Sequence, residues 1–459
     1  MYLSLATGVY TRIVGDMGYI ANMKNGKQLI FDKNGAMWLS VLSHTPRHID
    51  NVVDELIHHY SDVDRAILLE DFESFVYNLH NDDFILISDN CALENIPNDS
   101  KKLVGDIEIP TITDITIELT NRCNERCVHC YLADAKKDSG VFMDFTVVKD
   151  LIQQFSLMGG RRVTFTGGEV LLHHDFIEAC ELATQEKLEV AIFSNLIILN
   201  NEFLQRLKDV NVVEIQSSLY SVIAEEHDAI TQVKGSCLRT KASIERLVKI
   251  GLPVKIACPV MRQNAKSVVN VIKYARQLNI PIELELYINA RSNQDDDNLV
   301  NRLTIDEMRV FLQGLMEYDP NFCENTLRKN TTVYDEQYNL IDDLAMPLCQ
   351  AGFYGLYVVS DGTVATCPTM QGFEIGNIYK STLKEIWESS EKINLIRNIR
   401  EVNFERCINC EAKEYCVKCL AHNYAEGKDL MHIPTYACEM AFLSKEIIDN
   451  YNVSKTIKK

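Results

Sequence analysis

The fold of this chain follows from one short stretch, Cys123-Asn-Glu-Arg-Cys127-Val-His-Cys130, which comes directly after a predicted buried strand at 115–119. Its three cysteines are separated by three and by two residues, so a single loop carries all three sulfurs. Three thiolates can hold three irons of a four-iron cubane and leave the fourth iron open to a ligand from outside the protein. A structural zinc site closes all four positions. The spacing therefore favours an open iron–sulfur site over a zinc knuckle completed by His129.

Strand-like and helix-like segments alternate on both sides of this loop. The predicted strands lie at 115–119, 163–166, 190–194, 213–217, 254–259 and 282–287, and predicted helices between them include 146–158, 175–184, 241–250 and 267–278. Six such alternations predict a parallel sheet, closed or partly closed into a barrel, with helices outside. We therefore expect an α/β protein with a partial (β/α)6 TIM-type barrel over 112–320.

Polar residues and glycines gather where the predicted strands end. The second strand ends in Thr166-Gly167-Gly168-Glu169, and the third and fourth strands end near Ser194, Asn195 and Ser218. Ligands of parallel barrels collect at the carboxyl ends of the strands. Glycines allow backbone groups to approach a ligand closely, and a Glu carboxylate can accept hydrogen bonds from an ammonium group. Ser and Asn at such positions also commonly cap turns.

Together, the cysteine loop and the Gly-Gly-Glu segment resemble the radical S-adenosylmethionine (SAM) enzymes. The resemblance implies that Cys123, Cys127 and Cys130 are the catalytic cluster ligands and that SAM chelates the open iron. It also implies that Gly167, Gly168 and Glu169 bind the amino group of SAM, and that its ribose and carboxylate contact Ser194, Asn195 and Ser218. The family usually has Pro after the Glu, whereas this chain has Val170.

A second group of cysteines lies in the last quarter of the chain, at Cys349, Cys367, Cys407, Cys410, Cys416, Cys419 and Cys438. Seven thiolates are one short of two closed cubanes, and a single zinc could use only four of them. The alternative of a zinc ribbon is disfavoured because only five residues separate the two Cys-x2-Cys pairs, where ribbons need about 15–20. We expect two auxiliary clusters in a third, loop-rich domain held by metal rather than by a large core, after a bridging region at 321–348.

This cysteine pattern resembles the SPASM domain, here predicted over 349–459. The resemblance assigns Cys407, Cys410, Cys416 and Cys438 to an outer cluster, and Cys349, Cys367 and Cys419 to an inner one. With the SAM-binding cluster, this implies three [4Fe–4S] clusters. The inner cluster then lacks a fourth ligand, so either Cys323 or another scattered cysteine closes it, or one iron stays open for a substrate thiolate.

The first ninety residues are predicted to form a separate winged-helix module, followed by a linker at 91–111. Two strands joined by the turn at 24–26 precede helices at 32–42, 50–60 and 70–79 and a last short strand. This order resembles the PqqD-like peptide recognition element of enzymes that modify ribosomally made peptides. In that family the leader peptide adds as a strand beside the small sheet, which supplies backbone hydrogen bonds.

The composition of the chain disfavours some classes of binding partner. The chain has 459 residues, a formal net charge of −19 and fifteen cysteines, so phosphate backbones and anionic membranes are disfavoured as main partners. The predicted module at 1–90 has 6 Lys and Arg residues against 13 Asp and Glu residues. An odd cysteine count without a secretory signal argues against a disulfide framework. We expect a cytoplasmic protein that binds neither nucleic acid nor membrane.

Taken together, the resemblances imply a radical SAM peptide maturase. A 5′-deoxyadenosyl radical would abstract hydrogen from a precursor peptide bearing a leader, with flavodoxin or ferredoxin as the electron donor. The expected product is an intrapeptide thioether of the sactipeptide or ranthipeptide type. Carbon–carbon or carbon–oxygen crosslinking remains an alternative, as does a sulfatase maturase that forms formylglycine. A non-catalytic iron–sulfur sensor that binds DNA is the alternative from another class, and the acidic first module argues against it.

Overall fold

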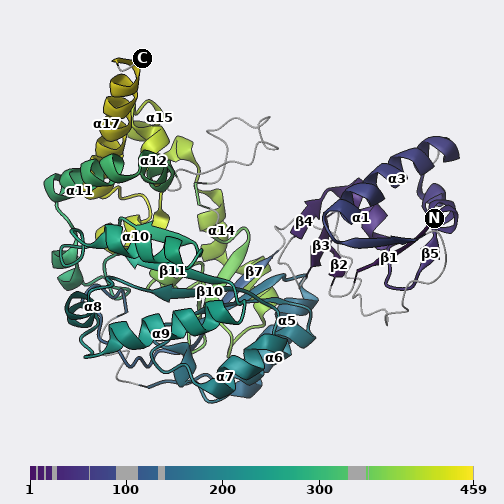
Figure 1. Cartoon of the computed structure of the whole chain (residues 1–459), viewed down its shortest axis with the longest axis horizontal. Helices are drawn as coiled ribbons and strands as arrows, with labels where there is room; N and C mark the ends of the chain where they lie inside the picture. The colour runs from purple at the N-terminus through teal and green to yellow at the C-terminus, as the bar shows by residue number, and fades with distance from the viewer. Residues whose placement is uncertain are drawn as a thin grey trace.

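The computed structural model of the chain describes residues 1–6, 9–14, 17–22, 28–60, 63–88, 112–132, 140–328, 348–349 and 351–457. These residues form a small N-terminal module and a larger body (Figure 1). The predicted linker at 91–111 lies outside the described residues, as does most of the predicted bridging region, of which 321–328 and 348 are described.

Six parallel strands form the centre of the larger body, and they neighbour one another in sequence order. They are β7 (Asp114–Thr120), β8 (Arg162–Gly167), β9 (Glu189–Phe193), β10 (Val212–Ser218), β11 (Val254–Pro259) and β12 (Ile282–Glu285). All six predicted strands are therefore confirmed. In the part of the chain that the structure describes, β12 does not pair with β7, so the sheet stays open as a partial barrel.

Helices between the strands bury their apolar faces on the sheet. The four predicted helices correspond to α5 (Phe145–Leu157), α6 (Phe176–Gln185), α9 (Ser236–Lys249) and α10 (Val268–Gln277). The sequence prediction omitted α7 (Asn201–Arg206), α8 (Ala224–Thr231), α11 (Ile305–Tyr318) and α12 (Pro320–Arg328). The capping box that opens α11, formed by Thr304 and Glu307, was a visible sequence signal for a helix start.

The C-terminal residues do not form the separate, loop-rich domain that the sequence analysis expects. The first strand of this region, β13 (Gly355–Val358), pairs in parallel with β7 and extends the barrel sheet, followed by β14 (Thr363–Ala365) and β15 (Gly376–Asn377). Its helices are α13 (Leu383–Ser389), α14 (Glu391–Asn398), α15 (Glu405–Ile408), α16 (Leu420–Gly427) and α17 (Thr435–Ile457). Side chains from several of these elements share one hydrophobic core with the barrel. A large common core, and not metal alone, holds this region.

One buried carboxylate fixes the junction between β7 and β13. The Glu118 side chain is fully buried, and it accepts hydrogen bonds from the Tyr357 hydroxyl at 2.9 Å and from the Ser360 hydroxyl at 2.8 Å. Burying a carboxylate is costly unless donors surround it. These donors therefore tie the end of β13 to the strand that leads into the cysteine loop.

The N-terminal module contains two small sheets and three helices. Its strands are β1 (Tyr2–Leu5), β2 (Val9–Val14), β3 (Met17–Asn22), β4 (Gln28–Phe31), β5 (Arg47–His48) and β6 (Ile85–Ser88), and its helices are α1 (Lys33–Ser40), α2 (Ile49–Leu56) and α3 (Arg65–Asn81). The predicted strands and helices are present, whereas β1 and β2 were not predicted, and the turn at 24–26 lies outside the described residues. The sheet orders are β5-β1-β6 and β2-β3-β4.

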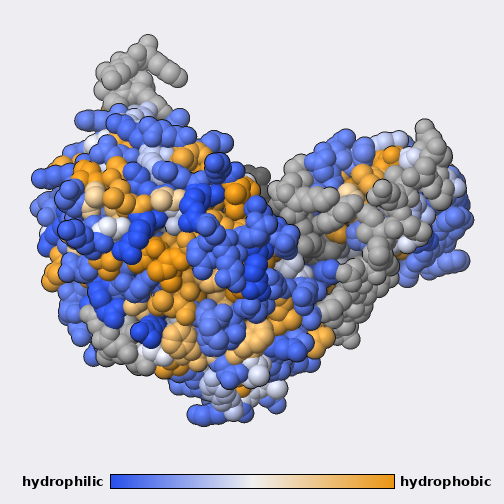
Figure 2. Space-filling model, turned by 60° about the horizontal axis from the view of Figure 1, so that its bottom comes forward, coloured by the Kyte–Doolittle hydropathy of each residue, from blue (hydrophilic) through white to orange (hydrophobic). Residues whose placement is uncertain are grey.

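Figure 2 shows hydrophobic residues gathered over the centre of the larger body on one face, with hydrophilic residues around them. None of the helices in the described ranges combines the length and apolar character needed to cross a bilayer.

Candidate active site

The predicted site residues converge on one cavity at the carboxyl ends of the barrel strands. The cavity has a volume of about 250 Å³ and is lined at one side by Cys123, Cys127 and Cys130. Its wall also contains the predicted residues Gly167, Gly168, Ser194, Asn195 and Ser218, whereas the predicted Glu169 is buried beside them and is not part of the lining. Parallel strands end at the same edge of the sheet, so residues about a hundred positions apart in sequence share one pocket.

The two glycines of the Gly-Gly-Glu segment allow close backbone contact with the start of the cysteine loop. The Gly168 amide donates to the Thr120 carbonyl at 2.8 Å, and the Glu169 amide donates to the Arg122 carbonyl at 2.8 Å. A Cβ atom on Gly167 would lie 2.3 Å from the Thr120 oxygen, and one on Gly168 would lie 2.4 Å from the Arg122 oxygen. In this structure the glycines hold the cysteine loop against β8, a role the sequence analysis did not predict.

Replacing Gly168 with Ala should therefore destabilise the fold and displace the cysteine loop. Main-chain oxygens, which cannot rotate away, occupy the space that the new methyl group needs. Overpacking of this kind costs about 1–3 kcal/mol of unfolding free energy, which denaturant unfolding can measure. We also expect weaker SAM binding, measured by equilibrium dialysis on the reconstituted protein.

Gly314→Ala is the matched control for this prediction. Gly314 lies within α11, and a Cβ atom there would meet nothing within 4 Å. Since Ala favours a helix interior over Gly, this variant should be neutral or more stable by roughly 0.5–1 kcal/mol. Equal stability losses in the two variants would contradict the close-contact role of Gly168.

Glu169 is a buried carboxylate whose oxygens already have partners. Its Oε1 accepts hydrogen bonds from the Ser194 hydroxyl at 2.6 Å and from the Leu171 amide at 2.9 Å, and its Oε2 accepts from the Asn195 amide at 2.7 Å. Burial raises the pKa of Glu169, and these hydrogen bonds oppose that shift. Ser194 thus positions Glu169, whereas the sequence analysis expected its hydroxyl to contact SAM.

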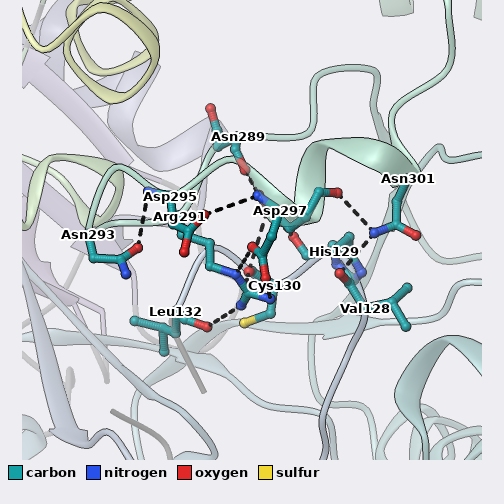
Figure 3. A network of polar contacts seen from close by, with 11 residues as sticks. Val128, His129, Cys130, Leu132, Asn289, Arg291, Asn293, Asp295, Asp297 and Asn301 are labelled. Carbon is teal, nitrogen blue, oxygen red and sulfur yellow. Dashed lines mark hydrogen bonds and ion pairs between the residues drawn. The ribbon is translucent and has the colours of Figure 1, made fainter. Parts of the chain in front are cut away.

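A polar segment after β12 holds the cysteine loop from its other side (Figure 3). The Asn301 side chain donates to the Val128 carbonyl at 2.9 Å, and Asn298 donates to the His129 carbonyl at 3.0 Å. The Arg291 guanidinium donates to the carbonyls of Cys130 and Leu132 at 3.2 and 3.1 Å. Sequence reasoning missed this clamp because no local motif marks it, since 159 to 173 residues separate the partners.

The three thiols at the cavity fit the expected cluster. Burial raises the pKa of Cys123 to about 12 and that of Cys127 well above its ordinary value, and the neighbouring Cys130 sulfur adds to both shifts. Metal binding would therefore release protons from them. The adjacent Glu125 carboxylate accepts from the Cys127 sulfur at 3.5 Å, while its buried Oε1 has no hydrogen-bond partner within the described residues. An unpaired acceptor beside a trio of thiols suits a ligand that carries hydrogen-bond donors.

The C-terminal cysteines separate into two groups in space. Cys349, Cys367 and Cys419 influence one another electrostatically, and burial raises the pKa of Cys349 to about 11 and of Cys419 to about 12. The second group consists of Cys407, Cys410, Cys416 and Cys438. These are the same two groups that the SPASM resemblance predicts, and both donor sets suit iron–sulfur clusters.

The scattered cysteines that the structure describes lie in the protein core. Cys323 is buried on α12, where its sulfur lies 3.8 Å from the Leu312 carbonyl oxygen, and the Cys237 and Cys258 sulfurs lie near the carbonyls of Ser221 and Tyr220. Cys180 is buried on α6, and Cys91 lies outside the described residues. None of the four described ones therefore joins the group of Cys349, Cys367 and Cys419.

A second cavity connects the barrel with the C-terminal region. It has a volume of about 270 Å³, and its lining includes Cys419 and His422 from the C-terminal region. Glu285, Tyr287 and Asn289, at and just after the end of β12, line both cavities. These three residues therefore lie between the cavity that contains the cysteine loop and the cavity that contains Cys419.

Two family models match the chain. The radical SAM superfamily model matches residues 117–281, and the model of the SPASM iron–sulfur cluster-binding domain matches residues 349–411. The first match runs from within β7 to the end of β11 and the helix after it, stops just before β12, and contains all the residues predicted to bind SAM. The second match contains Cys349 and Cys367 of the inner group and Cys407 and Cys410 of the outer group.

Sequence relatives and solved structures agree with these matches. The chain is 24% identical to an AdoMet-dependent heme synthase of Methanosarcina barkeri, over 70% of this chain and 95% of that protein. It is 25% identical to the antilisterial bacteriocin subtilosin biosynthesis protein AlbA of Bacillus subtilis, over 69% of this chain and 68% of that protein. The structure of Streptococcus suis SuiB bound to precursor peptide SuiA has the same fold, with a TM-score of 0.63 at 13% identity over 95% of this chain and 99% of that one. The chain thus combines a radical SAM domain with an iron–sulfur SPASM domain, and it is a radical SAM enzyme whose cofactors are SAM and iron–sulfur clusters.

Proposed function

We propose that this enzyme matures a ribosomally made precursor peptide and installs a thioether between a Cys sulfur and a carbon of the same peptide. The observation that carries this proposal is that Glu285, Tyr287 and Asn289 line both the cavity beside the cysteine loop and the cavity beside Cys419. A peptide held there can present one carbon to the SAM site and one sulfur to the group of Cys349, Cys367 and Cys419. That group offers three thiols, which leaves a fourth cluster position for the peptide sulfur.

In this proposal the residues of the barrel position and shield the reactants. Cys123, Cys127 and Cys130 hold the first cluster, and Gly167, Gly168 and Glu169 hold the amino group of SAM. When bound and reduced, this pair of cofactors supplies a 5′-deoxyadenosyl radical that removes a hydrogen atom from a nearby carbon. Ser194 keeps Glu169 oriented, and the Arg291 and Asn301 clamp fixes the cysteine loop. Fixed geometry of this kind is the main contribution a protein makes to such chemistry.

Formation of the thioether releases an electron, and the C-terminal region must accept it. A carbon–sulfur bond replaces one C–H and one S–H bond, so the substrate loses a hydrogen atom to the adenosyl group and then one proton and one electron. Clusters at the inner and outer cysteine groups would accept that electron, and a flavodoxin or ferredoxin would reduce the SAM-binding cluster. The same electron count applies to carbon–carbon and carbon–oxygen crosslinks.

The N-terminal module supports the assignment of a peptide as the substrate. The structure of SuiB bound to precursor peptide SuiA covers 95% of this chain. In the sheet β2-β3-β4 of the module, β4 is an edge strand whose Leu29 and Ile30 side chains are exposed. An edge strand with exposed apolar residues suits strand addition by a leader peptide, as expected of a PqqD-like module.

Ile30→Glu should therefore impair leader binding. Ile30 is 55% exposed on the edge strand, so the substitution removes an apolar contact and adds negative charge without opening the core. We expect a roughly tenfold weaker Kd for the leader peptide, since one lost apolar side chain is worth about 1.5 kcal/mol or more. Fluorescence anisotropy with a labelled leader measures it. Ile67→Glu, at a 57% exposed position on α3, is the control. Similar losses in both variants would reject strand addition at β4.

The proposed function is tested by incubating anaerobically reconstituted enzyme with SAM, a reductant and the peptide encoded by any small Cys-containing open reading frame beside its gene. We expect release of 5′-deoxyadenosine and a peptide that has lost two hydrogens and one alkylatable thiol per crosslink. A crosslinked peptide that keeps all its thiols would replace the thioether with a carbon–carbon or carbon–oxygen bond. Turnover of an iron porphyrin without peptide turnover would place the enzyme with the heme synthases.

A further inference from the structure

Glu125 lies in the cysteine loop, between Cys123 and Cys127, and one of its carboxylate oxygens has no donor. The residue is only 3% exposed, and it lines the barrel cavity. Within the described part of the chain, its buried Oε1 has no hydrogen-bond partner, and its Oε2 accepts from the Cys127 sulfur at 3.5 Å. A buried carboxylate is costly to the fold unless donors or a positive charge surround it. The missing donor at Oε1 therefore points to a ligand.

Cluster assembly removes the donor at Oε2 as well. The thiolate form of cysteine is the metal ligand, so Cys127 bound to iron no longer carries the proton that it shares with Glu125. The neighbouring Arg126 guanidinium donates to the main-chain carbonyls of Cys123 and Glu125. Among the described residues, the lining of this cavity contains no Lys or Arg. A positive charge that pairs with Glu125 in the cavity therefore comes from a bound molecule.

Glu169, the carboxylate that the sequence analysis assigns to SAM, is in a different position. It is buried outside the cavity lining, and it already accepts hydrogen bonds from the Ser194 hydroxyl and from the Leu171 and Asn195 amides. Of these two carboxylates, only that of Glu125 both lines the cavity and has an oxygen without a donor.

We propose that Glu125 accepts a hydrogen bond from the ammonium group of SAM. The ammonium is a charged donor, whereas the ribose and adenine of SAM offer neutral ones, and hydrogen bonds to charged donors are about twice as strong. A SAM molecule that chelates the open iron with its amino-acid part brings this group to the cysteine loop. Glu125 thus adds a second carboxylate to the Gly-Gly-Glu segment for recognition of the cofactor. The assignment does not depend on which bond the enzyme forms in a peptide.

The test compares two probes that differ only in the amino group, S-adenosylhomocysteine and its desamino analogue. Their affinities, and that of SAM, are measured by calorimetry on the reconstituted protein without a reductant, so that no chemistry is required. Glu125→Gln should weaken the binding of SAM and S-adenosylhomocysteine about tenfold, because hydrogen bonds to charged groups contribute the equivalent of such a factor. Binding of the desamino analogue should change less than twofold. Equal losses for both probes, or no loss for either, would overturn the proposal.

Further variants separate this role from support of the cluster. Gln has nearly the same size as Glu and retains an acceptor oxygen, so Glu125→Gln should hold as much iron as the wild-type protein. A loss of about four irons would instead assign Glu125 to cluster binding and overturn the proposal. Glu125→Asp should keep part of the preference for the amino group. Glu317→Gln, at an exposed position of α11, changes the net charge equally and should keep the wild-type affinities.

Spectroscopy gives a readout that is independent of turnover. Binding of SAM to the open iron should change the electron paramagnetic resonance spectrum of the reduced SAM-binding cluster. In Glu125→Gln the same change should require about tenfold more SAM, while the final spectrum at saturation stays the same. An unchanged midpoint in this titration would contradict the role of Glu125.

Discussion

Replacing Cys123, Cys127 and Cys130 together with Ala should abolish the release of 5′-deoxyadenosine from SAM. These three thiols line the barrel cavity next to the residues predicted to bind SAM. Without them the protein offers no cluster on which SAM can be reductively cleaved. We expect a reduction of at least a thousandfold, because the reaction has no other route in this site. Chromatography of quenched reactions measures the product.

Iron content provides the independent readout of this change. The wild-type protein should hold roughly twelve irons if it contains three cubanes, and the triple variant should hold about four fewer. Cys180→Ala is the control, because Cys180 is buried on α6 and does not line either cavity. It should keep its iron and its SAM cleavage. Persistent 5′-deoxyadenosine release by the triple variant would reject the role of this loop.

Replacing Cys349, Cys367 and Cys419 with Ala should abolish formation of modified peptide while 5′-deoxyadenosine is still released. Cys419 of the inner group lines the cavity that Glu285 and Tyr287 border, whereas Cys123, Cys127 and Cys130 line the other cavity. We expect the loss of about four irons and of essentially all crosslinked product, because the electron acceptor nearest the substrate and the proposed binding position of the peptide sulfur are then both removed. Mass spectrometry of the peptide and iron analysis measure the two effects.

Cys323→Ala is the control that also addresses the fourth ligand of this cluster. The Cys323 sulfur lies in the core near the Leu312 carbonyl, so removing it should change neither the iron content nor the product. Loss of inner-cluster iron in this variant would show that Cys323 is the missing ligand. Normal product from the variant without Cys349, Cys367 and Cys419 would exclude a role for that group in the reaction.

Local patterns in the sequence were sufficient to predict the parallel strands and to select residues, Glu169 excepted, that line one cavity at the ends of those strands. The spacing of Cys123, Cys127 and Cys130 and the Gly-Gly-Glu segment each depend on a few adjacent residues, so a single sequence displays them. The two C-terminal cysteine groups could be predicted from the SPASM resemblance. In contrast, β1 and β2 were missed because short strands carry little periodic signal, and their pairing depends on distant partners.

The sequence by itself determined the chemistry of the site, because cysteine spacing and strand alternation fix which groups one loop and one sheet edge can present. Only the tertiary structure decided which hydrogen-bond partners and which neighbouring elements those groups have. It joined β13 to β7 through the buried Glu118, turned Ser194 toward Glu169, and placed Arg291 and Asn301 on the cysteine loop. The physical reason is that hydrogen bonding and burial depend on which distant segments contact each other, and local periodicity in the sequence does not predict those contacts.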